Sequence, residues 1–136
     1  MDRIFSSATP PLERLTNYFD HVAQSQTAIH SECGSILGCP LFSLGSEICT
    51  QDAAIGQKVR EILDSYVKYF ESAIRDAHAQ GSLKAPNATT KAKLLFAFFQ
   101  GTLTQARIQN DLTYLHELKA GALELLGALP EKAIPA

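Results

Sequence analysis

The sequence predicts an all-α domain of five helices. Apolar residues recur at spacings of three and four through each long segment, as on one face of a helix. No segment shows the sustained alternation of period two that marks a strand. Breaks rich in proline, glycine and asparagine divide the chain, and the short connections favour antiparallel neighbours. With 136 residues, of which 46% are hydrophobic, one globular domain with a substantial core is expected.

The first helix is expected from about Pro10 to about Ser31, with Thr9 as its N-cap and Pro10 in its first turn. Its apolar stripe consists of Leu12, Leu15, Tyr18, Phe19, Val22, Ala23 and Ile29. Ahead of it, Ile4 and Phe5 lie in a stub that we expect to be too short to bury them. We interpret residues 1–9 as the remnant of a linker from a missing upstream domain.

A loop at residues 33–40, with two glycines and a proline, precedes a short helix from Leu41 to about Thr50. Asp52 is the expected N-cap of a long helix that ends at Gly81, a residue type favoured just beyond helix ends. Its apolar stripe consists of Ile55, Val59, Ile62, Leu63, Tyr66, Phe70, Ile74 and Ala77. This helix spans most of the domain.

The segment from Lys93 to Ile108 is expected to be the central helix, capped by Asn87 or Thr89, because apolar residues cover most of its circumference. Its narrow polar stripe consists of Lys93, Gln100, Thr104 and Arg107. Polar residues interrupt it well before the roughly 20 apolar residues of a membrane span. It is therefore either central in a bundle or in contact with its own core on one side and a partner subunit on the other.

The last helix is expected from the cap Asp111 onward, ended by Gly127, Pro130 and Pro135. Its seam, close to coiled-coil repetition, consists of Leu112, Leu115, Leu118, Ala122, Leu125, Leu126 and Leu129. The domain is thus assigned to residues 10–130 and a tail to 131–136. Because the last two helices carry more apolar surface than a monomer needs, we expect a homodimer with a four-helix interface across a two-fold axis. The expected interface consists of Phe96, Gln100, Thr104, Arg107, Leu115, Leu118, Ala122 and Leu125.

Composition argues against several classes of function. A net charge of −2 gives no basic surface for nucleic acid, and no phosphate-binding loop is present. His30, Cys33 and Cys39 lack the paired spacing of a zinc site, and carboxylates such as Glu71 are explained as surface charges. We therefore expect no metal, no cofactor and no catalysis. Three cysteines without disulfide spacing, and no signal segment, indicate a reduced, cytoplasmic protein.

Four runs taken together, at residues 38–48, 52–55, 71–83 and 97–111, resemble the C-terminal ligand-binding domain of tetracycline-repressor (TetR) family transcription regulators. The resemblance implies a TetR-type regulatory domain that encloses a small-molecule pocket and dimerises through its two C-terminal helices. It also implies that DNA is read by an N-terminal helix-turn-helix domain, which this sequence lacks. The chain is then expected to sense an effector and dimerise, and to act on DNA only through that missing domain.

The helices that surround the expected pocket offer aromatic, thiol and hydroxyl groups. The candidate ligand-binding residues are Cys39, Phe42, Ser43, Tyr66, Phe70, Phe98 and Thr102. Each aromatic side chain has the alternative role of filling the core. The hydroxyl groups of Ser43, Tyr66 and Thr102 are the stronger candidates, because a hydroxyl inside an apolar core needs a hydrogen-bond partner. An apolar effector would then bias the relative placement of the two subunits.

Cys39 supports an alternative function. It stands at the start of the short helix, where backbone N–H groups favour a thiolate, so the domain could sense oxidants or electrophiles. Free cysteines are also commonly buried as small hydrophobic residues. A third interpretation is a helical dimerisation module that binds no ligand.

Overall fold

The computed structural model describes residues 1–128 and confirms the all-α class: this part of the chain holds six helices and no strand. The helices are α1 (Pro11–Cys33), α2 (Pro40–Ile48), α3 (Ala53–Ala79), α4 (Ala88–Gln109), α5 (Thr113–His116) and α6 (Leu118–Leu126). The expected end of the domain at residue 130, the tail at 131–136 and the seam residue Leu129 lie outside the described residues.

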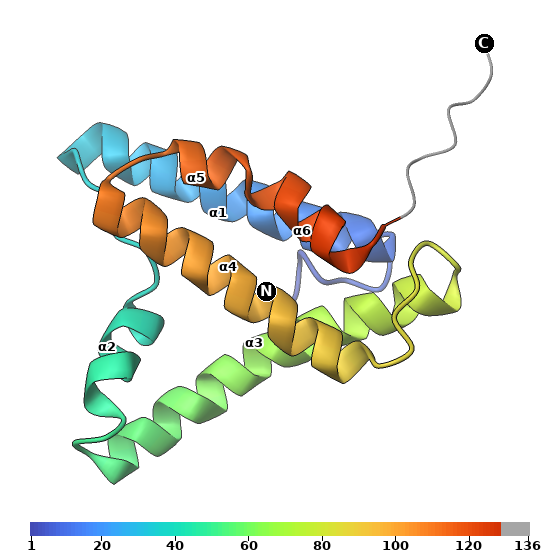
Figure 1. Ribbon diagram of the computed structural model, residues 1–136, viewed down its shortest axis with the longest axis horizontal. Helices are drawn as coiled ribbons and strands as arrows, with labels where there is room; N and C mark the ends of the chain where they lie inside the picture. Colours follow the sequence, from blue (N-terminus) through green and yellow to red (C-terminus); the bar gives the residue numbers. More distant parts are fainter. Residues whose placement is uncertain (129–136) are drawn as a thin grey trace.

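Helix α4 lies at the centre of the described chain, one of the two arrangements that its apolar circumference left open. It packs against α3 on one side and against α5 and α6 on the other, while α1 packs against both α3 and α6. Figure 1 shows α1 and the α5–α6 pair running alongside one another, with α3 crossing the molecule at an angle. Helix α2 packs on α3 and connects α1 to α3 at one end of the domain (Figure 1).

Most helix ends lie where local sequence signals placed them. The Asp52 carboxylate accepts the Ile55 N–H at 2.9 Å, and the Asn87 side chain accepts the Thr90 N–H at 3.0 Å. Gly127 ends α6 in the left-handed conformation, at φ 62°. Helix α1 begins one residue later than predicted: Pro10 occupies the N-cap and no side chain caps the helix.

The predicted last helix is divided into α5 and α6, which gives six helices instead of five. Asp111 starts a separate turn, because its carboxylate accepts both the N–H and the hydroxyl of Thr113, at 2.9 and 2.7 Å. Between the two helices Glu117 adopts φ −86° and ψ −10°, at the edge of the α region. The interruption is small, and Leu115 and Leu118 on either side of it both remain buried.

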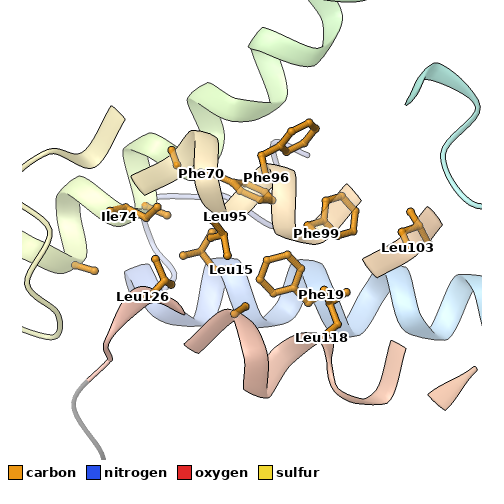
Figure 2. Packing of buried hydrophobic residues seen from close by; sticks show 14 of the residues in the cluster. Leu15, Phe19, Phe70, Ile74, Leu95, Phe96, Phe99, Leu103, Leu118 and Leu126 are labelled. Atoms are coloured by element: carbon orange, nitrogen blue, oxygen red, sulfur yellow. The ribbon is translucent and has the colours of Figure 1, made fainter. Parts of the chain in front are cut away.

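The core is an aromatic cluster enclosed by aliphatic side chains. Phe19 of α1, Phe70 of α3 and Phe99 of α4 are each at most 2% exposed, and their ring centroids lie 5.7 to 6.3 Å apart. Figure 2 shows these rings meeting between the helices, with Leu15 and Leu118 nearby. Aromatic pairs at such separations are each worth about 0.5–1.5 kcal/mol beyond the area they bury. The cluster fixes α1, α3 and α4 relative to one another.

Residues 1–9 pack against the domain, in contrast to the expectation that Ile4 and Phe5 lie in a stub too short to bury them. Both side chains are half-buried, and the Phe5 ring lies 5.4 to 5.9 Å from the rings of Tyr18, Tyr69 and Phe70. The segment gains this cover because it folds back over α1 and α3.

The buried guanidinium of Arg14 holds this N-terminal segment in place. It donates to the Thr9 carbonyl at 2.8 Å, to the Ser7 carbonyl at 3.4 Å and to the Asp76 carboxylate at 2.6 Å. A single side chain thereby ties the segment to both α1 and α3.

Candidate functional site

A cavity of about 300 Å³ lies between α1, the loop before α2, α3 and α4. It is lined by Met1, Tyr18, Val22, Gln26, Gly38, Cys39, Pro40, Leu41, Tyr66, Phe99, Gln100 and Leu103. The lining holds apolar and aromatic surface with a few amide, hydroxyl and thiol groups, and no charged side chain. Small-molecule sites in proteins have this composition, with volumes of roughly 300–1,000 Å³. The larger surface hollows beside α4, α1 and α3 are not lined by Phe19, Phe70 or Phe99.

The loop that forms one wall of the cavity is held by two side-chain amides. Gln26 of α1, 8% exposed, accepts the N–H groups of Leu37 and Gly38 at 3.1 and 3.0 Å. Asn110, which ends α4, accepts the Ile36 N–H at 3.1 Å and donates to the Gly34 carbonyl at 2.9 Å. The loop is thus fixed to α1 and to α4.

Gly38 allows the chain to turn into this wall. Its φ of 68° lies in the left-handed region, which favours glycine. A Cβ at this position would also lie 3.3 Å from Cδ of Arg107. The turn places the half-buried Cys39 in the lining, directly before α2.

Gln100 lines the cavity and carries an unpaired polar atom. The side chain is 2% exposed, and among the described residues its amide oxygen, Oε1, has no hydrogen-bond partner. A buried acceptor without a partner costs about 1–3 kcal/mol. Because the residue lines the cavity, a turn of this amide would allow a bound molecule to supply the missing hydrogen bond.

Tyr18 joins the cavity to the aromatic core. Burial raises the pKa of its hydroxyl above the ordinary value of 10.0, and the neighbouring Cys39 and Tyr66 raise the pKa further. Tyr18 therefore stays protonated and neutral at physiological pH. Its ring also lies 5.5 Å from the rings of both Phe70 and Phe99.

The structure brings two of the seven predicted ligand residues, Cys39 and Tyr66, together in this cavity. Phe70 is fully buried in the aromatic cluster. Phe42 is half-buried on α2, and neighbouring Ser43 accepts a hydrogen bond from Arg107 at 2.9 Å. The other two, Phe98 and Thr102, line a separate groove on the far side of α4.

The sequence analysis did not assign Tyr18, Phe99 or Leu103 to the pocket, and it placed Gln100 in the dimer interface. In the sequence, the first three of these residues look like ordinary members of apolar helix stripes. The position of Gln100 could have indicated a buried polar group, because this amide directly follows the run LLFAFF in the most apolar segment of the chain. Which neighbour that amide faces depends on tertiary packing.

The chain itself buries five of the eight residues expected in the dimer interface. Phe96, Gln100, Leu115, Leu118 and Ala122 are at most 7% exposed, because α1 and α3 cover the inner faces of α4 and α5–α6. These side chains have almost no surface left for a partner. Of the others, Thr104 and Leu125 are half-buried and Arg107 is exposed.

A different face of α4 is apolar and uncovered within the described chain. Leu94 and Ile108 are 54% and 70% exposed, and Tyr114 on α5 is 37% exposed. Beside this face a groove of about 610 Å³ is lined by Phe98, Thr102, Asp111, Thr113, Tyr114, Glu117, Ala120, Gly121 and Glu124. The groove lies between α4 and the α5–α6 pair.

Two further properties concern residues 1–128. In that range no group of three histidine, cysteine or carboxylate side chains is arranged to hold a metal ion. None of its helices combines the length and the hydropathy that crossing a membrane requires. Cys33, Cys39 and Cys49 are free thiols, and Cys33 is the exposed one.

Comparison with known families gives one match, which covers most of the chain. Residues 11–122 match the family model described as "Tetracyclin repressor-like, C-terminal domain". No curated protein and no solved structure matches the chain. The matched range includes α1 to α5, the first half of α6 and nearly all of the cavity lining. The chain therefore belongs to the family of tetracycline-repressor-like C-terminal domains.

Proposed function

We propose that this chain is the effector-sensing and homodimerisation domain of a transcriptional repressor, and that its effector is a small apolar molecule bound in the cavity between α1, α2, α3 and α4. Family membership supports a regulatory domain rather than an enzyme. The observation that carries the effector site is the cavity lined by Gln100, whose buried amide oxygen is unpaired among the described residues. DNA is contacted through an N-terminal helix-turn-helix domain, and the three free thiols fit a cytoplasmic protein.

The effector acts through α4, which has an inner face on the cavity and an outer face available to a partner subunit. Its inner face contributes Phe99, Gln100 and Leu103 to the cavity, and Arg107 donates to Ser43 of α2. Its outer face is exposed. A ligand that binds one placement of α4 more tightly than another shifts the population toward that placement. The outer face then moves with the helix.

The outer face of α4 supports the proposed dimer contact. Leu94, Phe98, Gly101, Gln105 and Ile108 follow one another at alternating spacings of four and three, the repeat of a coiled-coil seam. We call these five residues the α4 seam. Gly101 lies at its centre, where its small size permits close approach of a second helix. The interface is then formed by this seam and the adjoining α5–α6 groove of both subunits.

Gly101→Arg tests the dimer. An added Cβ at Gly101 meets no atom within 4 Å, so the single chain accommodates the arginine, and replacing glycine inside a helix favours the helix by about 1 kcal/mol. Sedimentation velocity is expected to show a dimer for the wild type and a monomer for Gly101→Arg. Gln57→Arg, on an exposed position of α3, is the matched control and stays dimeric. A Gly101→Arg protein that remains dimeric places the interface elsewhere.

Cys39 and Cys33 provide an internal test of the effector site. An apolar ligand in the cavity is expected to slow alkylation of Cys39 by N-ethylmaleimide and to leave alkylation of the exposed Cys33 unchanged. Peptide mass spectrometry after timed quenching, across a panel of apolar compounds that raise the melting temperature, measures both rates. Thermal stabilisation without protection of Cys39 would move the effector site out of this cavity.

A second candidate function, sensing of electrophiles by Cys39, rests on the place of the thiol in the cavity lining beside Tyr18 and Tyr66. Its sulfur would form a bond to the β-carbon of an unsaturated carbonyl compound, and the α-carbon would take up a proton. Intact-mass and peptide analysis after limited exposure to such a compound discriminates the two functions. Modification of Cys39 ahead of the more exposed Cys33 supports the sensor, and the reverse order removes it.

A further inference from the structure

We propose that the effector is a small, uncharged aromatic molecule that carries a hydroxyl group, and that this hydroxyl pairs with the amide of Gln100. The inference rests on the proposed function in one respect, since it takes the cavity beside Gln100 as the effector site. It adds the chemical class of the ligand.

The need for a hydroxyl follows from the state of Gln100. Its amide oxygen is enclosed and unpaired, although the residue lines the cavity. The last torsion of a glutamine side chain has a broad energy profile, so the amide can turn and present either its oxygen or its NH₂ group to the cavity. A hydroxyl suits both orientations, because it donates to the oxygen and accepts from the nitrogen. A carbonyl or ether can only accept.

The absence of charged side chains in the lining disfavours ionised ligands. No lysine, arginine, histidine, aspartate or glutamate side chain lines the cavity. The nearby guanidinium of Arg107 donates to Ser43 outside it. A carboxylate or an ammonium group entering this cavity would lose its hydration, and no lining side chain would offer it a counter-charge, which is unfavourable. A neutral hydroxyl loses much less.

The rings in the lining favour an aromatic body. Tyr18, Tyr66 and Phe99 come from three different helices and surround the space next to Gln100. Aromatic rings pack well against one another in tilted or offset arrangements, as the core of this domain already shows. The volume of about 300 Å³ is at the small end of the range for ligand sites, which suits a molecule of one or two rings.

Three naphthalene derivatives of similar size test the inference. 2-Naphthol carries the hydroxyl, 2-methoxynaphthalene replaces it with an ether, and 2-naphthoate carries a carboxylate. Isothermal titration calorimetry on the wild-type protein at pH 7 is expected to show 2-naphthol binding about tenfold more tightly than the ether, the effect of one buried hydrogen bond. The carboxylate is expected to bind most weakly of the three.

Gln100→Leu assigns this preference to the amide. Leucine has a similar volume and no polar atom, so 2-naphthol is expected to lose its tenfold advantage in this variant while the ether changes little. Gln24→Leu, an exposed position on α1, is the matched control and leaves all three affinities unchanged. If Gln100→Leu does not fold, the order of the three affinities for the wild-type protein still tests the inference.

The inference is overturned if the ether binds as tightly as 2-naphthol, if the carboxylate binds best, if Gln100→Leu keeps the preference, or if none of the three binds. Failure of the proposed function gives a different result, since no apolar compound of any class would then protect Cys39 from alkylation. If apolar compounds without a hydroxyl protect Cys39 as well as those with one, the cavity remains the effector site. Only the proposed chemical class of the effector is then wrong.

Discussion

Gln100 shows how a single residue can be unfavourable for folding and favourable for binding. Its amide oxygen is shielded from water and has no partner within the described chain. The side chain also directly follows the run LLFAFF in the most apolar segment of the sequence, where a leucine would fit the helix pattern. A polar atom kept in this environment lowers the stability of the domain, and in the proposed function it is the group that binds the ligand.

Gln100→Leu is therefore expected to stabilise the ligand-free protein. Removing one buried, unpaired acceptor without creating a cavity is worth about 1–2 kcal/mol in the free energy of unfolding. Urea unfolding followed by circular dichroism measures this change, with Gln24→Leu as the surface control. A loss of stability would show that the amide makes a favourable interaction in the empty domain.

Tyr18 gives a second prediction at the scale of one residue, in alkaline solution. Its pKa in the folded protein is raised above 10.0, so its contribution to stability is complete below pH 10 and is lost as the pH rises further, when the unfolded chain ionises first. By pH 11 the loss is about 1 kcal/mol. Cys39 and Tyr66 both help to raise the pKa of Tyr18, so the comparison is made with Tyr18→Phe, which leaves these two residues in place.

The free energy of unfolding of the wild type is thus expected to fall more steeply from pH 9 to pH 11 than that of Tyr18→Phe. Urea titrations at several pH values supply both curves. Parallel curves would mean that the Tyr18 hydroxyl ionises as readily in the folded domain as in the unfolded chain.

At the scale of helices, local chemistry determined the ends that could be predicted. Asp52 and Asn87 cap α3 and α4 through side-chain hydrogen bonds to residues three positions further on, which sequence alone encodes. The division between α5 and α6 was not predictable in this way. Glu117 is an ordinary helix former, and its departure from regular helix geometry accompanies the burial of Leu115 and Leu118 on either side.

The contact between α2 and α3 depends on a glycine. A Cβ at Gly45 would lie 2.6 Å from Cγ1 of Val59, so Gly45→Ala pushes the two helices apart. We expect a net loss of about 1 kcal/mol or more, since overpacking outweighs the gain in helix propensity. In a Val59→Ala background the clash is removed and the same substitution is expected to become stabilising by up to about 1 kcal/mol.

A double-mutant cycle from urea unfolding of the four proteins measures this coupling. Equal effects of Gly45→Ala in both backgrounds would show that α2 does not rest on Val59.

At the scale of the whole molecule, the fold was more predictable than the site. Helical periodicity and the breaks rich in proline, glycine and asparagine gave the fold class, and left two arrangements open for α4. They showed that Gln100, Thr104 and Arg107 share a face, but not whether α3, α6 or a second chain covers it. The cavity depends on that arrangement, together with a loop held by Gln26 and Asn110 from opposite helices. No local pattern encodes such a distant pairing.

Effector binding and dimerisation are expected to be thermodynamically linked, since both use α4. If 2-naphthol changes the dimer dissociation constant by some factor, dimer formation must change the affinity for 2-naphthol by a corresponding factor. Sedimentation equilibrium with and without 2-naphthol gives the first quantity, and titration of the wild type and of monomeric Gly101→Arg gives the second. Equal affinities in dimer and monomer would show that the two processes are independent.

Gln100 and Gly101 are consecutive residues, one turned into the cavity and the other out to the seam. Successive side chains on a helix point about 100° apart and are held rigidly by the same backbone. Any rotation of α4 about its own axis that improves the fit to a bound ligand must rotate the outer face through the same angle. In the proposed function the cavity and the α4 seam are therefore coupled directly, because both are built on the same rigid helix.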